Sequence, residues 1–318
     1  MPHYYVFNGD ADGLCALQQL YLSDPKPGTL ITGVKRDIQL LKRLSENKSD
    51  SMTVLDISLD KNRDALVQLL DNNNSIAYFD HHFAGEIPSH PNLDAHIDTA
   101  PNTCTSLIVN EYLSSAHPLW AIAGAFGDNF NEKATSLAQE HNVSLENIEK
   151  LKNLGVLINY NAYGATVDDL HFKPEILAEE IQPYANPLDF ASNSQACKTL
   201  EAGYKEDLNN AQQLSARIES SKTALYLLPN AAWARRVSGV FANSLNRQYP
   251  NRAHALLTEI TGGNYLVSIR APKNNPVGAD DLCRKFNTGG GRKAAAGINK
   301  LPHSDYDNFL HHFNEQFS

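Results

Sequence analysis

The first half of the sequence contains residues that could bind divalent cations. The segment FNGDADGLCA, residues 7–16, carries two aspartates two positions apart, and a later Asp-His-His triplet places a carboxylate beside two imidazoles. Carboxylate oxygens with an occasional imidazole are ligands for Mn²⁺ or Mg²⁺, whereas structural zinc sites favour thiolates. The candidate ligands and catalytic groups are Asp10, Asp12, Asp56, Asp80, His81, His82 and Asp128.

Each of these motifs also has a structural explanation when it is taken alone. Asp and Gly favour turns, so DADG could simply form one, and Asp56 or Ser58 could cap a following helix. Asp128 could end a helix. Two histidines beside Asp80, by contrast, have little packing value, and clustered carboxylates raise one another's pKa unless cations are present. The combination predicts a metal site, and two ions about 3.5–4 Å apart would suit phosphate-ester hydrolysis.

Alternating strand and helix patterns would place these residues at one edge of a sheet. Apolar runs predict strands at residues 3–7, 29–34, 52–57 and 75–80. Amphipathic periodicity predicts helices at residues 13–22, 37–44 and 59–70. This alternation predicts a mostly parallel sheet, whose ligand sites lie at the carboxyl ends of the strands.

The rest of the chain changes character twice. Helical spacing of apolar residues begins near residue 105, and acidic amphipathic segments continue to about residue 222. Strand patterns then return, with a TGGN turn suited to a hairpin. We therefore predict an α/β protein with a parallel-sheet domain that ends in a helical part (residues 1–190), a linker (191–221) and a smaller α/β domain (222–318).

A second candidate site follows from the glycine-rich segment GGGRKAAAG, residues 289–297. Three glycines and three alanines indicate a backbone that a ligand approaches closely, and amides in such a turn can bind an anion. Arginine would add bidentate contacts to a phosphate or a guanine edge. For the Arg235–Arg236 pair, a plain helix surface is an equally good interpretation. The predicted substrate-binding residues are Arg270, Gly289, Gly290, Gly291, Arg292, Lys293, Arg235 and Arg236.

Charge separates the two parts of the chain. The 318 residues carry a formal net charge of −9, but residues 222–318 contain twelve Lys and Arg against six Asp and Glu, and residues 1–221 contain fifteen against thirty. This division suggests that the first part holds cations and the second meets anions. An acidic chain does not suit a sequence-independent grip on long duplex DNA.

Neither membrane insertion nor export is expected from the sequence. No apolar run approaches the roughly 18 residues of a membrane span, and the N-terminus lacks the features of a signal peptide. The four cysteines have no CxxC spacing. These features predict a cytoplasmic protein with reduced thiols. The oligomeric state stays open, with a homodimer as one alternative.

The motifs together carry a family resemblance. The sequence resembles the DHH phosphoesterases, which are named for the triplet found here at residues 80–82, and their DxD motif corresponds to Asp10 and Asp12. The segment at residues 289–297 resembles the signature of the DHHA1 substrate-binding domain. The resemblance covers nearly the whole chain and is weakest at residues 131–221. It implies a parallel-sheet DHH domain, a helical connector and a smaller α/β DHHA1 domain.

The resemblance implies two metal ions with separate ligands. Asp56 would bridge the ions, Asp10 would complete the shell of the first ion, and the second ion would be held by Asp12, His81 and Asp128.

It also implies roles for the neighbouring residues. Asp80 would orient a ligand or bind metal, and His82 would touch the scissile phosphate. Many family members supply a histidine ligand just ahead of the DxD, where this sequence has Asn8. Either Asn8 offers its amide oxygen to the first ion or that ion is weakly held. Thr105 and Ser106 are expected to cap a helix.

The function implied by the resemblance is metal-dependent hydrolysis of very short oligoribonucleotides. The layout is similar to that of nanoRNases and of diribonucleases that convert the linear dinucleotide pGpG, a product of cyclic-di-GMP breakdown, to GMP. Two Mn²⁺ ions are the expected cofactors, with Mg²⁺ as an alternative. Short RNA or a linear dinucleotide is the expected partner.

Three alternatives stay open at this point. A RecJ-like single-strand exonuclease would be expected to carry a further oligonucleotide-binding domain, for which no sequence follows residue 318. A cyclic-dinucleotide phosphodiesterase would need a wider site, and the membrane and sensor segments of such relatives are not found. A non-catalytic nucleotide-binding module would result if one metal position were empty.

Overall fold

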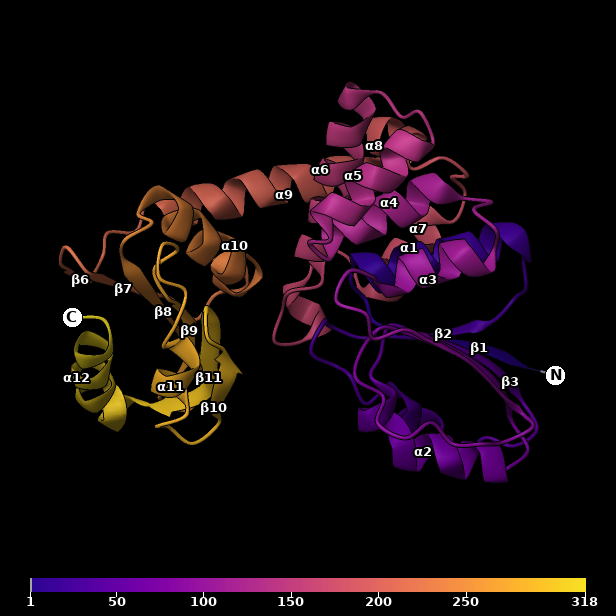
Figure 1. Ribbon diagram of the computed structural model, residues 1–318, viewed down its shortest axis with the longest axis horizontal. Coiled ribbons are helices and arrows are strands. Elements are labelled where there is room, and N and C mark those ends of the chain that lie inside the picture. Colours follow the sequence, from indigo (N-terminus) through magenta and orange to yellow (C-terminus); the bar gives the residue numbers. More distant parts are fainter. Residues whose placement is uncertain (1) are drawn as a thin grey trace. The chain divides into compact units, whose positions relative to one another are not determined.

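The computed structural model describes residues 2–318, which form two compact units (Figure 1). The first unit ends at Ala202, and the second runs from Gly203 to Ser318. Both units mix strands and helices, and the first contains the parallel sheet, so the predicted fold class is confirmed. Helix α9 (Gln195–Gln212) occupies most of the segment predicted to be a linker. None of the helices in the described part of the chain is both long and apolar enough to cross a membrane.

A five-stranded parallel sheet forms the centre of the first unit, in the order β2-β1-β3-β4-β5. Its strands are β1 (His3–Phe7), β2 (Thr29–Ile31), β3 (Ser51–Leu55), β4 (Ser75–Asp80) and β5 (Leu93–Ile97). The first four strands lie where the sequence predicts them. The fifth was not predicted, because this edge strand includes charged and polar residues and has only a weak apolar alternation.

Helices cover both faces of this sheet. On one face, α2 (Leu59–Asp71) and the 3₁₀ helix η1 (Leu40–Leu44) bury their leucines, and α1 (Ala11–Ser23) and α3 (Thr105–Tyr112) lie on the other (Figure 1). The helix predicted at residues 37–44 is wrong in length, because a 3₁₀ helix of five residues is enough to bury its three leucines. The layer on the α1 side is completed by α4 (Pro118–Gly127), α5 (Asn131–Glu140), α6 (Leu145–Asn161), η2 (Val167–Asp169), α7 (Pro174–Ile181) and α8 (Pro187–Asn193).

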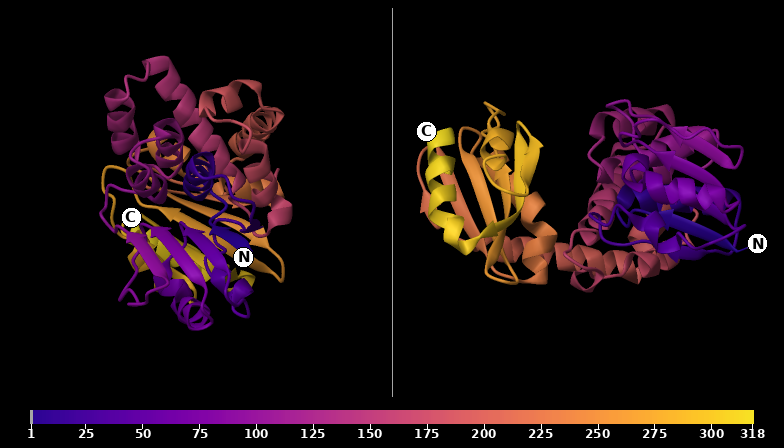
Figure 2. Two further views of the ribbon diagram at one scale, coloured as in Figure 1. Left: turned by 90° about the vertical axis from the view of Figure 1, so that its right-hand side faces the viewer. Right: turned by 90° about the horizontal axis from the view of Figure 1, so that it is seen from below.

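The second unit contains a six-stranded sheet in the order β10-β11-β9-β8-β7-β6. The strands are β6 (Ile218–Glu219), β7 (Thr223–Leu228), β8 (Ala253–Ile260), β9 (Asn264–Arg270), β10 (Gly289–Arg292) and β11 (Ala295–Pro302). Helix α12 (Tyr306–Gln316), which follows η3 (His303–Asp305), lies along one face of this sheet (Figure 2). Apolar side chains of that face pack against α12 and α11 (Ala279–Cys283). The other face packs against α10 (Ala232–Gln248). The TGGN hairpin is confirmed as the connection between β8 and β9.

The glycine-rich segment forms a hairpin of two strands, whereas the sequence suggested an irregular turn. Strand β10 pairs antiparallel with β11, which places Gly290 opposite Gly297 and Gly291 opposite Ala296. Gly291 has φ 142°, and a Cβ there would lie 2.5 Å from the Cα of Ala296. A Cβ on Gly290 would meet nothing within 4 Å. Glycine is therefore required for folding at position 291, whereas position 290 has no steric constraint.

Alanine at these two glycines should separate the packing requirement from any ligand requirement. We expect Gly291→Ala to lower the free energy of unfolding by about 1–3 kcal/mol, because the new Cβ is both strained and crowded. Gly290→Ala should stay within roughly 0.5 kcal/mol of the parent, as surface changes usually do. Urea denaturation measures both values. Equal stability of the two variants would contradict the hairpin geometry.

A buried histidine in β8 should make the stability of the protein depend on pH. Neither ring nitrogen of His254 has a hydrogen-bond partner among the described residues. Burial, and after it the charge of Arg252, lowers the pKa of His254 from 6.5 to about 4. Between these values the unfolded chain binds a proton that the folded chain does not bind. The contribution of the neutral His254 ring to the free energy of unfolding is therefore complete above pH 6.5. It is lost as the pH falls toward 4.

Replacement of His254 should flatten this part of the pH profile. We expect the parent protein to lose up to about 3 kcal/mol more than His254→Leu between neutral pH and pH 4. Urea denaturation at each pH measures the difference. His311→Gln, at an exposed position on α12, is the control and should keep the parent profile. Identical profiles for His254→Leu and the parent would refute the assignment.

Candidate functional site

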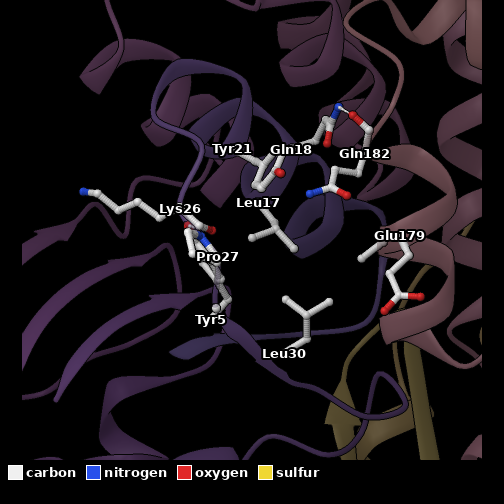
Figure 3. Close-up of a pocket in the computed structure, with 11 residues that line it drawn as sticks. Tyr5, Leu17, Gln18, Tyr21, Lys26, Pro27, Leu30, Glu179 and Gln182 are labelled. Carbon is white, nitrogen blue, oxygen red and sulfur yellow. Dashed lines mark hydrogen bonds between the residues drawn. The ribbon is translucent and has the colours of Figure 1, made fainter. Parts of the chain in front are cut away.

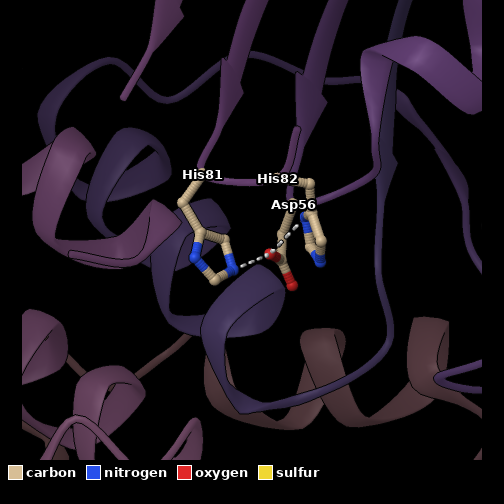
Figure 4. Close-up of side chains that lie close together, drawn as sticks. All are labelled: Asp56, His81 and His82. Carbon is tan, nitrogen blue, oxygen red and sulfur yellow. Dashed lines mark ion pairs between the residues drawn. The ribbon is translucent and has the colours of Figure 1, made fainter. Parts of the chain in front are cut away.

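The ends of β3 and β4 and the adjoining helices bring the predicted metal-site residues together. The Nε2 atom of His81 lies 3.5 Å from an oxygen of Asp56, 3.7 Å from one of Asp128 and 4.0 Å from one of Asp12. Figure 4 shows the rings of His81 and His82 approaching the Asp56 carboxylate from two sides. Asp56 and the two histidines follow neighbouring strands of the parallel sheet, whereas Asp12 lies in α1 and Asp128 follows α4. The fold therefore brings together residues that are far apart in the sequence.

Asp10 precedes α1, and both of its carboxylate oxygens have partners. Its Oδ1 caps the helix by accepting the backbone N–H groups of Asp12 and Gly13 at 3.0 and 3.1 Å. Its Oδ2 accepts a hydrogen bond from Lys35 Nζ at 2.5 Å. A Cβ on Gly13 would lie 2.1 Å from the carbonyl oxygen of Asn8, which explains the glycine of the DADG motif. Turn formation and site formation are therefore two roles of the same motif.

Asp12 is fully buried and is held by the N-terminus of α3. Its Oδ2 and Oδ1 accept the backbone N–H groups of Thr105 and Ser106 at 2.7 and 2.8 Å. No side chain at the N-cap position, Cys104, caps α3, so Asp12 supplies this cap from another helix. The Thr105 hydroxyl donates to Asp56 at 3.1 Å. The Thr-Ser pair thus positions two carboxylates of the site.

Two carboxylates of the cluster have raised pKa values. Asp56 follows β3 with a left-handed φ of 58°. Burial, and after it the charges of the neighbouring aspartates, raises the pKa of Asp56 well above its usual value. For Asp128, which follows α4, burial and the nearby carboxylates raise the pKa to about 6 although Lys35 and His81 oppose the rise. Carboxylates that repel one another in this way are stabilised by a bound cation.

Asp80 and His82 form a hydrogen-bonded pair at the edge of the cluster. His82 Nδ1 lies 2.7 Å from Asp80 Oδ1, and the His82 side chain is 43% exposed. Burial alone would lower the pKa of His82, but the hydrogen bond and charge of Asp80 raise it above its usual value. Asp80 Oδ2 is buried and has no hydrogen-bond partner among the described residues.

Lys35 belongs to the site but was not predicted there. Its Nζ lies 2.5 Å from Asp10 Oδ2, 3.2 Å from Asp128 Oδ1 and 3.3 Å from Asn159 Oδ1. Burial would raise the pKa of Asp10 and lower that of Lys35, but their ion pair reverses both shifts. A signal was present in the sequence, because Lys35 follows the second predicted strand at the same edge of the sheet. Asn8 donates through Nδ2 to the Lys35 carbonyl at 3.3 Å, and its buried Oδ1 has no partner among the described residues.

The donor set fits a divalent metal ion. Carboxylate oxygens and imidazole nitrogens suit Mn²⁺, and an unpartnered buried oxygen such as Asp80 Oδ2 is the kind of atom that a cation or its water satisfies. Two overlapping sets have donor atoms within 4.8 Å of one another, namely Asp12, His81 and Asp128, and Asp56, His81 and His82. The first set corresponds to the ligands expected for the second ion.

In the second unit, two of the predicted basic residues lie in one row of the sheet. The strand register places Arg292 opposite Ala295 and Ala295 opposite Arg270, so two strand spacings, about 10 Å, separate the backbones of the arginines. The next row on the same face contains Gly290, Gly297 and Ser268. Arg270 donates to Asn243 of α10 at 2.8 Å, which identifies this face as the one next to α10. The residues between and beside the two arginines are therefore small.

The remaining basic residues differ in their surroundings. Arg236 forms a bidentate ion pair with Asp207 of α9 at 2.7 and 3.1 Å, and both side chains are largely buried. This pairing ties α10 to α9 and argues against the predicted substrate contact. Arg235 donates to Asn230 at 2.6 Å, and Lys293 is exposed at the hairpin turn.

The pocket drawn in Figure 3 lies elsewhere in the first unit. It has a volume of about 330 Å³ and is lined from α1, β1, the segment before β2 and α7, with Tyr5, Leu17 and Tyr21 among its residues. None of the predicted site residues lines it. This pocket is therefore separate from the candidate site.

Sequence comparisons give no relatives for this chain, whereas structural comparisons do. No protein-family model matches the sequence, and no curated protein matches it. The fold is similar to RecJ from Thermus thermophilus in complex with Mn²⁺, at 17% identity and a TM-score of 0.61, with coverage of 100% of this chain and 52% of RecJ. This chain thus spans about half the length of that protein.

Two further solved structures have comparable likeness. One is PggH, a pGpG-specific phosphodiesterase from Vibrio cholerae, at 13% identity and a TM-score of 0.56, with coverage of 99% of this chain and 98% of PggH. The other is an exopolyphosphatase-related protein from Bacteroides fragilis, at 13% identity and a TM-score of 0.51, with coverage of 99% and 91%. At these identities the likeness is one of fold. The structural comparisons thus confirm the fold that the sequence motifs imply.

Proposed function

We propose that this chain is a divalent-metal-dependent phosphodiesterase that hydrolyses very short oligoribonucleotides, with linear dinucleotides such as pGpG as the preferred class. The observation that carries the proposal is the convergence of three carboxylates on His81, beside the Asp80–His82 pair. The likeness in fold to a pGpG-specific phosphodiesterase over nearly the full length of both chains supports the choice of substrate class.

The first unit would provide the metal ligands. A divalent ion such as Mn²⁺, held by Asp12, His81 and Asp128, would polarise a water and offset charge on the phosphate. Mn²⁺ also occupies two RecJ structures of similar fold. The family resemblance of the sequence implies a second ion near Asp10 and Asp56.

His82 would act as the general acid. Its Nδ1 is engaged by Asp80, which leaves Nε2 to donate a proton to the departing 3′ oxygen. The raised pKa of His82 favours the protonated ring that this role requires.

The second unit would bind the phosphate or base of the substrate. Arg270 and Arg292 lie in one row with Ala295 between them, and the neighbouring Gly290 has open space where a side chain would be. Guanidinium groups suit both a terminal phosphate and a guanine edge. A short ligand needs few such contacts, which agrees with the small number of basic residues.

A second candidate is a single-strand exonuclease, because the fold is also similar to RecJ. Substrate length distinguishes a dinucleotide phosphodiesterase from such an exonuclease. Activity on a cyclic dinucleotide tests the remaining alternative, a cyclic-dinucleotide phosphodiesterase. A cytoplasmic location and a homodimer stay predictions from the sequence.

A substrate panel with Mn²⁺ tests the proposed function. We expect pGpG to be hydrolysed at least about tenfold faster than a long single-stranded RNA, single-stranded DNA or cyclic-di-GMP. Asp128→Asn, which removes a ligand charge while conserving size, should lower kcat/KM on pGpG by at least about 100-fold. The matched control is Asp60→Asn on α2, outside the cluster, and it should retain parent activity. Equal rates on short and long strands would refute the dinucleotide preference, and no hydrolysis by folded protein would refute the enzyme.

The role of His82 can be tested through the leaving group. We expect His82→Gln to lower kcat on pGpG by roughly 100-fold, because general acid catalysis is lost. On bis(p-nitrophenyl) phosphate the loss should be less than about tenfold, because p-nitrophenolate departs without a proton. His90→Gln, outside the cluster, is the control. Equal losses on both substrates would show that His82 does not donate the proton.

A further inference from the structure

Lys35 occupies the part of the site where the sequence motifs lead one to expect a first metal ion. Its ammonium has three N–H donors, and three acceptors surround it, at 2.5 Å (Asp10 Oδ2), 3.2 Å (Asp128 Oδ1) and 3.3 Å (Asn159 Oδ1). The side chain is 28% exposed, so the ion pair is partly shielded from water. The ammonium is therefore fixed by its contacts.

An ion in the same place would compete with this ammonium for the same oxygen. A divalent ion binds carboxylate oxygen at about 2.1 Å, and Asp10 Oδ2 already has Lys35 Nζ at 2.5 Å. The other oxygen of Asp10 caps α1. A metal ion at Asp10 would thus have to displace the Lys35 ammonium, whose positive charge would oppose its approach.

The ligands for the other ion are not engaged in this way. Backbone N–H groups hold the oxygens of Asp12 and leave a lone pair on each, and Asp128 Oδ2 faces His81 Nε2 at 3.7 Å. The carboxylate of Asp128 is therefore shared, with Oδ1 toward Lys35 and Oδ2 toward the metal ligands. Asn8, in the place of a histidine ligand, is neutral and donates to the Lys35 carbonyl.

We propose that Lys35 takes the place of the first metal ion, so that each chain binds a single divalent ion at Asp12, His81 and Asp128. This inference rests on the proposed metal-dependent function and sharpens it. Asp128 lies between the ammonium and the ion, as a carboxylate does between two metals. The ammonium would also be a positive group for a nonbridging phosphate oxygen of the substrate.

Metal stoichiometry tests the proposal without reference to activity. Titration of the full chain with Mn²⁺, followed by calorimetry and by electron paramagnetic resonance, should give one ion per chain and no spin-coupled pair. Lys35→Ala should bind a second ion and show the coupled signal, because Asp10 Oδ2 is released. Adding Asn8→His to Lys35→Ala should tighten the second ion at least about tenfold, because it supplies an imidazole ligand.

Three controls keep the outcomes distinct. Lys42→Ala, in the same connection but bonded to Gln39, should bind one ion as the parent does. Lys35→Met keeps the length of the side chain if Lys35→Ala is poorly folded, and it too should gain the second ion. Two coupled ions in the parent, or no second ion in either folded Lys35 variant, would overturn the inference. A folded parent that binds no Mn²⁺ would overturn the proposed function itself.

Discussion

Buried negative charge is the constraint on which the first unit depends. Five aspartates meet at one edge of the parallel sheet, and four kinds of group stabilise them. Helix N-termini hold Asp10 and Asp12, a hydroxyl holds Asp56, and an imidazole holds Asp80. Lys35 adds the full positive charge that the backbone cannot provide. The strand order and the start of each helix determine which group reaches which carboxylate.

In the second unit, the constraint is the lack of side chains at the glycines of the β10–β11 hairpin. In the hairpin, Gly291 is required by its own backbone and by Ala296, whereas the open side of Gly290 lies one row from Arg270 and Arg292. A surface with little bulk and two guanidinium groups would bind an anion without the desolvation of many polar atoms, as the proposed function requires. The proposed division between cation binding in the first unit and anion binding in the second agrees with the opposite net charges of the two parts of the chain.

Most of the fold and the carboxylates of the site could be predicted because they obey local rules. Strand periodicity locates β1 to β4, and ligands at the ends of parallel strands follow from topology. The position of Lys35 after the second predicted strand is a sequence signal, but its pairing could not be predicted, because Asp128 and Asn159 come from distant parts of the chain. The ion pair of Arg236 could not be predicted either, because its partner Asp207 lies in a segment with weak sequence patterns. The β10 strand was missed because glycine has low strand propensity and pairing alone makes it a strand.

The cap that Asp12 provides to α3 has a consequence for how such sequences change over time. The two carboxylates of the DADG motif start two helices, so the motif is needed for folding as well as for chemistry. A descendant with different chemistry at this site would still be under selection to retain both aspartates. Divergence of function should therefore appear first at positions without a capping role, such as Lys35, Asn8 and His82.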